Sequence, residues 1–156
     1  MDTVSKRVRS RIMSKIKSSN TGPEKLAEKL LVPLGFYKQK SVSIFEGAVM
    51  KASMKVDFVM HGHGEQAFSV AVFVDGCFFH GCPKHYKEPT SNVKYWRDKI
   101  RNNRKRDARE DAALIGAGWI VVHIWEHTLK NTNAKRFIVP VIQGLIKAGS
   151  KEVIRI

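Results

Sequence analysis

The 156-residue chain is 43% hydrophobic, which is enough to bury the core of one compact domain. It has no apolar run long enough to span a bilayer and no apolar secretory-signal centre near its basic amino terminus, so we expect a soluble, cytoplasmic protein. Its formal net charge of +14 predicts binding to a polyanion, and nucleic acid is favoured over an anionic membrane because the basic runs carry no apolar membrane-binding face.

The first 20 residues are predicted to form a basic arm ahead of a single domain over residues 21–156. The arm can lie along phosphates, and part of it is predicted to be an amphipathic helix because four apolar residues recur at spacings of three and four: Val8, Ile12, Met13 and Ile16. A partly disordered tail is the alternative. Thr21 and Glu24 then have the spacing of a capping box, which predicts a helix from about Gly22 to Val32.

Short strands are predicted over residues 36–41 and 42–44, whereas residues 46–53 are weakly informative. Residues 55–60 have the pattern of a strand in which Asp57 stands among apolar neighbours. A charged carboxylate there is costly unless it meets a cation or a donor, which makes Asp57 a candidate functional residue. Residues 61–65 are predicted to be a turn, with His61 and His63 in solvent rather than on a metal.

A buried strand is predicted over residues 67–74, and it ends in residues that can bind metal. Asp75, Gly76 and Cys77 follow it directly, and Cys82 and His85 complete a short-range cluster of ligands that zinc prefers. Tetrahedral zinc would need a fourth ligand. The alternative is a disulfide between the two cysteines, which a reducing compartment disfavours.

A long helix is predicted from Ser91 or Asn92, as its cap, to about Ile115, and glycines at 116 and 118 stop it. It is densely basic, and its mixture of cations with Asn103 suits phosphate contacts with some hydrogen-bond readout. Residues 119–125 predict a buried strand with His127 just beyond it, residues 131–148 a closing helix bent by Pro140, and residues 151–156 a short strand. This order predicts a mixed α/β sheet flanked by helices.

Four blocks in this order resemble the very short patch repair (Vsr) DNA mismatch endonucleases. They are RSRIMSKIKSSNTGPEKLAEKLL, VFVDGCFFHGCPKHY, KYWRDKIRNNRKRD and GWIVVHIWE, and they cover most of the chain. The resemblance implies a restriction-endonuclease-like core, a structural zinc site and a magnesium-dependent nick on the thymine strand beside a thymine-guanine (T:G) mismatch.

The resemblance also assigns roles to residues. Asp57 matches the catalytic metal-binding aspartate, and Val74 matches the position whose main-chain carbonyl also binds magnesium. His80 matches the catalytic histidine, Glu24 an amino-terminal acid of the active site, and Asp75 a catalytic position that varies. The zinc positions fall on Cys77, Cys82, His85 and His127. Structural roles remain as alternatives. Asp57 could be a buried structural acid, His80 a further group of the zinc loop, and Glu24 only a part of its capping box.

Aromatic wedges of the family match Phe78, Phe79 and Trp96, and apolar wedges between base steps are a known way to kink DNA. Further DNA contacts are predicted for cations and an amide of the long helix: Lys94, Arg97, Asn103 and Arg104. The chain departs from the family in two places. Met54, Lys55 and Val56 replace a glycine-containing turn and proline before Asp57, and Phe79 replaces a tryptophan.

The predicted substrate is double-stranded DNA with a T:G mismatch, and the enzyme is expected to be a prokaryotic, nucleoid-associated monomer. Mismatch repair proteins and a cytosine-5 methyltransferase system are the partners that the resemblance suggests. Two alternatives stay open. One is a restriction-type nuclease acting on matched or modified DNA, and the other is a catalytically inactive, zinc-stabilised DNA-binding module.

Overall fold

The computed structural model describes residues 8, 19–38, 41–62, 67–149 and 151–156 of the chain. Its centre is a five-stranded mixed sheet in the order β1-β4-β5-β6-β7. The first three strands pair antiparallel, whereas β5, β6 and β7 run parallel. The strands span Tyr37–Lys38 (β1), Phe58–His61 (β4), Ser69–Asp75 (β5), Ile120–Trp125 (β6) and Val153–Arg155 (β7).

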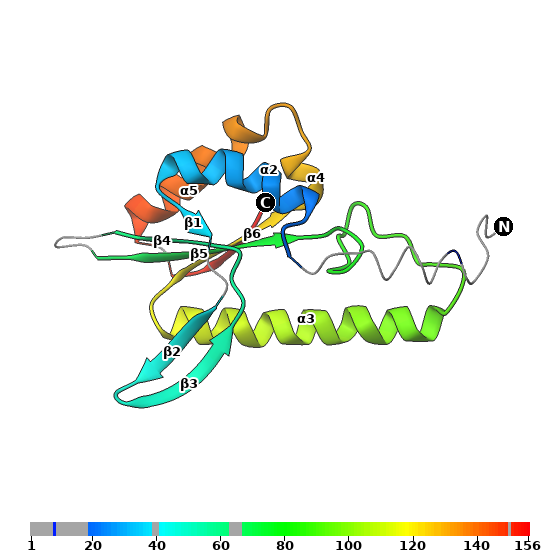
Figure 1. Cartoon of the computed structure of the whole chain (residues 1–156), viewed down its shortest axis with the longest axis horizontal. Helices are drawn as coiled ribbons and strands as arrows, with labels where there is room; N and C mark the ends of the chain where they lie inside the picture. Colours follow the sequence, from blue (N-terminus) through cyan, green and yellow to red (C-terminus); the bar gives the residue numbers. More distant parts are fainter. Residues whose placement is uncertain (1–7, 9–18, 39–40, 63–66, 150) are drawn as a thin grey trace.

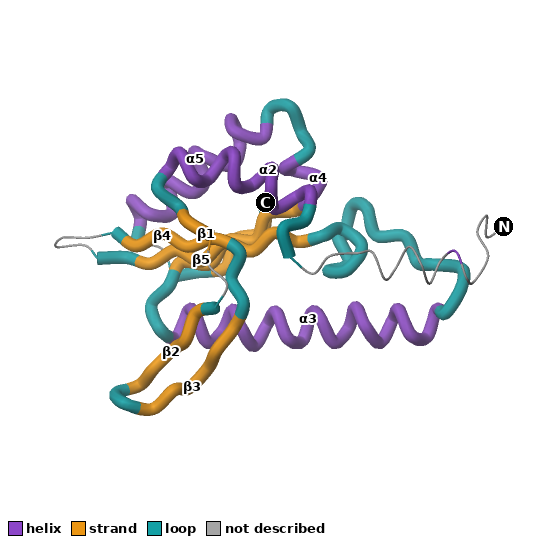
Figure 2. Tube along the Cα trace, in the orientation of Figure 1, coloured by secondary structure: helices purple, strands orange, loops and turns teal. Residues whose placement is uncertain are grey.

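Helices cover both faces of this sheet, as Figures 1 and 2 show. One face carries α2 and α5, and the opposite face carries the long α3, which connects β5 to β6 with the loop before it. A two-stranded antiparallel hairpin, β2 with β3, projects on the α3 side. The remaining bounds are Gly22–Leu31 (α2), Val32–Leu34 (a 3-10 helix, η1), Val42–Glu46 (β2), Val49–Met54 (β3), Val93–Gly116 (α3), Glu126–Leu129 (α4) and Ala134–Ala148 (α5).

Two apolar clusters fill the space between these layers. Because side chains alternate along a strand, Val72 and Val122 point to one face and Phe73 and Val121 to the other. The first pair packs in the cluster that contains the α2 and α5 residues, and the second packs with Leu114 of α3 and with the hairpin. The sheet is therefore buried on both sides, which fixes where the carboxyl ends of β5 and β6 emerge.

Most predicted elements are confirmed within one to three residues, and the capping box is present. Thr21 is the N-cap of α2, and its side chain accepts a hydrogen bond from the Glu24 N–H. Pro140 lies inside α5, as predicted. Residues 39–40 of the first predicted strand, residues 63–65 of the predicted turn and most of the basic arm lie outside the described residues.

The structure adds to the prediction or differs from it in several details. Strand β3 forms in residues 46–53, where no element was assigned, because Val49–Met54 pairs with β2. The strand expected over residues 55–60 begins only at Phe58, so Asp57 precedes it. His127 follows β6 as predicted, and it lies in the short helix α4. Asn92 stands at the N-cap of α3 with φ 52, but its side chain makes no capping hydrogen bond.

None of the helices in the described part of the chain combines the length and the apolar character that crossing a membrane requires.

Candidate active site

Asp57 lies beside the carboxyl-terminal half of β5. Phe58 pairs with Val72, and the Val74 N–H two residues further along β5 donates to Asp57 Oδ2 at 2.7 Å. Burial raises the pKa of Asp57 to about 6, and the negative charges of Glu24 and Asp75 add to this, while the Val74 N–H and the charge of His80 oppose it. Asp57 is therefore a half-buried carboxylate in a group of acids, an environment that a bound cation would relieve.

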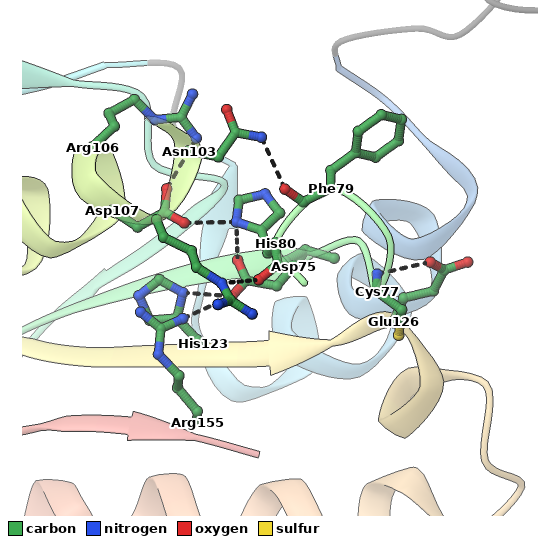
Figure 3. Close-up of polar contacts among 12 residues, drawn as sticks. Asp75, Cys77, Phe79, His80, Asn103, Arg106, Asp107, His123, Glu126 and Arg155 are labelled. Carbon is green, nitrogen blue, oxygen red and sulfur yellow. Dashed lines mark hydrogen bonds and ion pairs between the residues drawn. The ribbon is translucent and has the colours of Figure 1, made fainter. Parts of the chain in front are cut away.

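His80 lies in the loop after β5, between two carboxylates (Figure 3). Its Nδ1 is 2.7 Å from Asp107 Oδ2 and 3.6 Å from Asp75 Oδ1. Because ionised carboxylates only accept hydrogen bonds, Nδ1 carries the proton and donates it towards Asp107. Burial acts to raise the pKa of Asp107, but the hydrogen bonds and charges of His80 and Arg106 outweigh it and hold that pKa below its usual value. The ring is thereby oriented with Nε2 as the nitrogen available to accept a proton.

The backbone of this loop is held by α3. Asn103 Nδ2 donates to the Phe79 carbonyl at 2.9 Å, and Arg104 donates to the carbonyls of His80, at 3.3 Å, and Gly81, at 2.6 Å. Gly81 has φ +62, and a Cβ there would stand 2.5 Å from the Arg104 guanidinium. A side chain at position 81 would therefore strain the backbone and displace the arginine. Helix α3 fixes both the position of His80 and its hydrogen-bond partner.

A cluster of four potential metal ligands includes three residues of this loop and one of α4. The ligand atoms of Cys77, Cys82, His85 and His127 all lie within 4.8 Å of one another. The Cys77 Sγ to His127 Nδ1 distance is 3.3 Å, and Cys82 Sγ lies 3.7 Å from Nδ1 of both His85 and His127. Tetrahedral zinc with ordinary ligand bonds has ligand-to-ligand edges of roughly 3.3 to 3.8 Å, so these four side chains can hold one metal ion.

Electrostatics at the cluster also suit a cation. Burial raises the pKa of the Cys77 thiol, and the adjacent Cys82 raises it further against the hydrogen bond from His127. Burial likewise lowers the pKa of His127, helped by the charges of His85 and Lys84, which favours the neutral imidazole that ligates metals. The Cys77 N–H donates to Glu126 Oε2 at 3.3 Å, so α4 is tied to the loop by a further contact.

The predicted aromatic residues form one cluster beside His80. Phe78 lies with its ring centroid 5.3 Å from that of Phe79 and 5.0 Å from that of Trp96, and Phe79 lies 6.3 Å from Trp96. Tyr86 and Tyr95 extend the cluster, and Tyr95 is 59% exposed. Exposed and half-buried rings at the edge of a reactive loop form a surface on which bases can stack.

The outer face of α3 is basic and exposed along its length. Its exposed cations are Lys94, Arg97, Lys99, Arg101, Arg104, Lys105, Arg106 and Arg109. Arg97 pairs with Glu88 through two hydrogen bonds, so one of the predicted DNA contacts already has an acidic partner. Such a row of cations is suited to phosphates and predicts salt-dependent binding.

The structure thus brings most predicted site residues together around the loop of residues 76–85. Asp57, Asp75 and His80 interact electrostatically, and the four predicted zinc ligands cluster. Glu24 is close enough for its charge to raise the pKa of Asp57, but its own carboxylate accepts from the Asn20 N–H and the Thr21 hydroxyl. Asn103 is buried, and its side chain already donates to a carbonyl of the loop. It is therefore not free to make the predicted contact with DNA.

Sequence reasoning missed the polar residues buried under α3. Asp107 was given no role from the sequence, yet it forms a hydrogen bond with His80. His123 in the centre of β6 bonds Asp75 at 2.9 Å and Asp111 at 2.8 Å, and Arg155 of β7 bonds the same two acids at 2.9 and 3.1 Å. The available signal was spacing: Asn103, Asp107 and Asp111 recur every four residues between Ile100 and Leu114, on the buried stripe of α3.

Comparisons with known proteins place the chain among DNA endonucleases of one family. The sequence profile of the family described as DNA mismatch endonuclease Vsr matches residues 1–87, more than half of the chain. The chain is 39% identical to the type II nicking enzyme V.NaeI of Lentzea aerocolonigenes, over 76% of this chain and 68% of that protein. It is 32% identical to the type II nicking enzyme V.XorIIP of Xanthomonas oryzae pv. oryzae, over 85% and 90%. It is 28% identical to the DNA mismatch endonuclease Vsr of Escherichia coli, over 83% and 76%.

Proposed function

The chain belongs to the DNA mismatch endonuclease Vsr family and is a DNA nicking endonuclease, and from this premise we propose that it nicks the thymine strand beside a T:G mismatch in a magnesium-dependent reaction. The observation that carries the proposal is the position of His80. Its Nδ1 is bonded to Asp107, while the aromatic cluster of Phe78, Phe79 and Trp96 begins one residue away in the same loop. A proton acceptor and two potential base-stacking side chains therefore share one loop, and Trp96 of α3 packs against it.

His80 is the proposed general base. With its Nδ1 proton committed to Asp107, Nε2 accepts a proton from the attacking water as the water oxygen bonds to phosphorus and the scissile P–O bond breaks. Asp107 stabilises the imidazolium that forms. A positioned base of this kind typically contributes about 100-fold to 10,000-fold in rate.

Asp57 and the main-chain carbonyl of Val74 are the proposed magnesium ligands, and Glu24 supports them from the first turn of α2. The site fits a hard cation because burial and neighbouring negative charge raise the pKa of Asp57 to about 6, so a divalent ion would offset unfavourable charge. When bound, the ion would stabilise the negative charge that develops on the phosphate. These proposed ligands lie beside a strand of a mixed sheet, and this arrangement supports the proposal of a restriction-endonuclease-like core.

Zinc is the proposed occupant of the Cys77, Cys82, His85 and His127 cluster. Two thiolates and two imidazoles fill a tetrahedral shell and leave no open position, so the proposed role is structural. A metal here would tie the loop that carries His80 to α4. The loop segment that carries Phe78, Phe79 and His80 would then be held at both of its ends.

The aromatic cluster is the proposed source of mismatch preference. Inserting a ring between base steps costs unstacking energy, and that cost is lowest where pairing is already weak. Phe78, Phe79 and Trp96 would therefore insert more readily at a T:G step than at a matched step. Lys94, Arg97 and Arg104 are proposed to contact phosphates, which positions the duplex without reading its sequence.

The relatives favour a second candidate, a restriction-type nuclease acting on matched or modified DNA, because several of them are named type II nicking enzymes. An inactive DNA-binding module does not agree with membership of an endonuclease family.

One experiment separates the two enzymes. Matched and T:G duplexes of identical sequence are incubated with the protein, with Mg²⁺ or with chelator, and both strands are labelled. We expect nicking of the thymine strand of the mismatched duplex only, and only with Mg²⁺. Equal cleavage of both duplexes would replace the proposal by the restriction-type alternative, and cleavage in chelator would remove magnesium from it.

A further inference from the structure

Asp75 lies behind His80 at the end of β5, and its side chain has almost no contact with solvent (Figure 3). Asp75 Oδ1 is 3.6 Å from His80 Nδ1. Asp75 Oδ2 accepts hydrogen bonds from His123 Nδ1 and from Arg155 Nη1, each at 2.9 Å. One carboxylate therefore connects the proposed base to two further side chains that lie deeper in the fold.

A second acid closes this group into a ring. Asp111 Oδ1 accepts from His123 Nε2 at 2.8 Å, and Asp111 Oδ2 accepts from Arg155 Nη2 at 3.1 Å. Since both nitrogens of His123 face carboxylate oxygens, both carry protons and the ring is an imidazolium. The cluster of Asp75, Asp111, His123 and Arg155 thus contains two anions and two cations and is neutral as a unit.

Strand register explains why these side chains meet. His123 of β6 is the partner of Phe73 on β5 and of Arg155 on β7, so all three lie at one level of the sheet. Asp75 follows Phe73 by two residues and points to the same face. The Phe73 ring stacks on His123 with centroids 4.9 Å apart, and Asp111 comes from α3, the helix that covers this face of the sheet. Each member comes from a different element, so the cluster has little freedom to rearrange.

Arg155 also lines the same cavity as His80. A cavity of about 570 Å³ is lined by His80, Asp107 and Arg155 together with residues of the metal-binding loop. The guanidinium therefore lies at the boundary between the buried cluster and the proposed reaction site.

We propose that His123, Arg155 and Asp111 are positioning residues that act through Asp75 on His80. This inference rests on the proposed role of His80 as the base. Asp107 alone bonds Nδ1 but leaves the ring plane free to tilt, whereas a fixed acid on a second side restricts it. Without its two cations, Asp75 would be left as an unpaired buried charge and would turn away from its present position, because such a charge is strongly disfavoured. This change removes the second acid from the side of Nδ1.

The first test compares Arg155→Gln with Arg155→Lys at saturating DNA. We expect Arg155→Gln to lower the kcat of nicking by roughly 10-fold to 100-fold, as for other groups that orient a catalytic residue, while the Kd for DNA changes less than about 2-fold. Arg155→Lys keeps the charge and should recover most of the lost rate. A loss of DNA affinity with unchanged kcat would mean that Arg155 contacts the substrate instead, and would overturn the proposal.

Two controls separate positioning from loss of charge and loss of fold. Arg136→Gln removes the same charge from an exposed position on α5 and should change neither kcat nor Kd. Ile142→Ala weakens the core on the other face, and its kcat should stay at the wild-type value below the melting temperature. The double variant Asp75→Asn with Arg155→Gln should be no slower than Asp75→Asn alone. Multiplied effects would show that Arg155 does not act through Asp75.

A spectroscopic measurement tests the same inference without any substrate. The ring N–H proton of His80, identified by its loss in His80→Gln, should give a slowly exchanging NMR resonance in the wild type and in Arg155→Lys. In Arg155→Gln and Asp75→Asn the resonance should broaden or exchange faster. An unchanged resonance in both variants would overturn the proposal. If the wild type nicks matched and T:G duplexes equally, the proposed specificity fails, but this measurement still decides the positioning role.

Discussion

The two faces of the sheet are built from the same strands but bury different kinds of side chain. On the face covered by α2 and α5, Val72, Val122 and Ile124 pack against Ile138 and Ile142 in a wholly apolar cluster. On the face covered by α3, the apolar packing around Leu114 gives way near the carboxyl ends of β5 and β6 to buried acids and a buried histidine. The core of one face buries apolar side chains alone, and the core of the other also positions charge.

This difference between the two faces explains where the proposed catalytic loop lies. A buried carboxylate is retained only where a cation or donor offsets its cost, and the α3 face has such partners for Asp75, Asp107 and Asp111. The same face ends at the loop that carries His80 and the metal-binding cluster. The comparison therefore predicts that substitutions of the buried polar residues on the α3 face and of its loop alter nicking, while substitutions in the apolar core on the α2 and α5 face alter stability.

The largest expected effect is on the loop that ends the α3 face. Cys82→Ser or His127→Ala should remove zinc, and structural zinc sites contribute on the order of 10 kcal/mol to folding in small domains. We expect loss of stoichiometric zinc by metal analysis, a large drop in melting temperature and no measurable nicking. His61→Ala, at an exposed histidine outside the cluster, is the control and should keep its zinc. Zinc-free wild-type protein with an unchanged melting temperature would show that the cluster binds no structural metal.

The next largest expected effect is on the nicking rate alone. His80→Gln should lower the nicking rate at least roughly 100-fold because it removes the proton acceptor, and Asp57→Asn should do the same by removing a charged oxygen ligand. Both variants should keep zinc and should bind DNA with near wild-type affinity in a filter or anisotropy assay. A wild-type rate in either variant would exclude that residue from the reaction.

How far the sequence predicted this site depends on whether the signal was local. The zinc-ligand spacing after the strand and the capping box of Thr21 and Glu24 are local patterns, and both are found in the structure. The sheet flanked by helices follows from the periodicity of each segment. Strand β3 could not be found in this way, because its burial pattern is mostly exposed and its pairing depends on β2.

Long-range polar contacts account for what was missed. His123 stands in an otherwise apolar strand, and nothing nearby in the sequence reveals that Asp75, 48 residues away, and Arg155 will meet it. Asn103, by contrast, was assigned to DNA from the composition of the helix, whereas its amide is bonded to the Phe79 carbonyl. Its position on the buried stripe of α3 was the signal that separates it from the exposed cations of the same helix.

On the apolar face, a core truncation should separate stability from activity. Ile142 is 1% exposed, and Ile142→Ala should cost about 2 to 5 kcal/mol of unfolding free energy through lost burial and a residual cavity. Urea denaturation measures the change. Ile142→Val should cost only about 0.5 to 1.5 kcal/mol. A kcat that falls in parallel with stability, measured where each variant is fully folded, would contradict the division between the two faces.

The charged face should add a pH dependence to stability that the apolar face cannot provide. Burial opposes protonation of His123, but the hydrogen bonds that its ring donates to Asp111 and Asp75 outweigh it and raise its pKa to about 9, against the charge of Arg155. A raised pKa in the folded state means that this stabilisation is complete below about pH 6.5 and is lost as the pH rises through about 9. The unfolding free energy should fall between pH 7 and 9.5. His123→Gln should flatten this slope, and an equally steep slope in that variant would assign it to other groups.

The smallest expected effect concerns the first turn of α2, where a structural role and the proposed catalytic support coincide. Thr21 accepts from the Glu24 N–H, and Glu24 accepts from the Thr21 hydroxyl at 2.9 Å and from the Asn20 N–H at 2.6 Å. Thr21→Ala removes the cap and should cost about 1 kcal/mol of stability in denaturant titrations, while Thr21→Ser should keep it. Because Thr21 carries no charge towards Asp57, its loss should leave nicking intact. Glu24→Gln retains an acceptor oxygen but removes the charge beside Asp57, so it should reduce nicking more than stability. If both variants change stability alone, Glu24 is only a capping residue, and the α2 face makes no contribution to the chemistry.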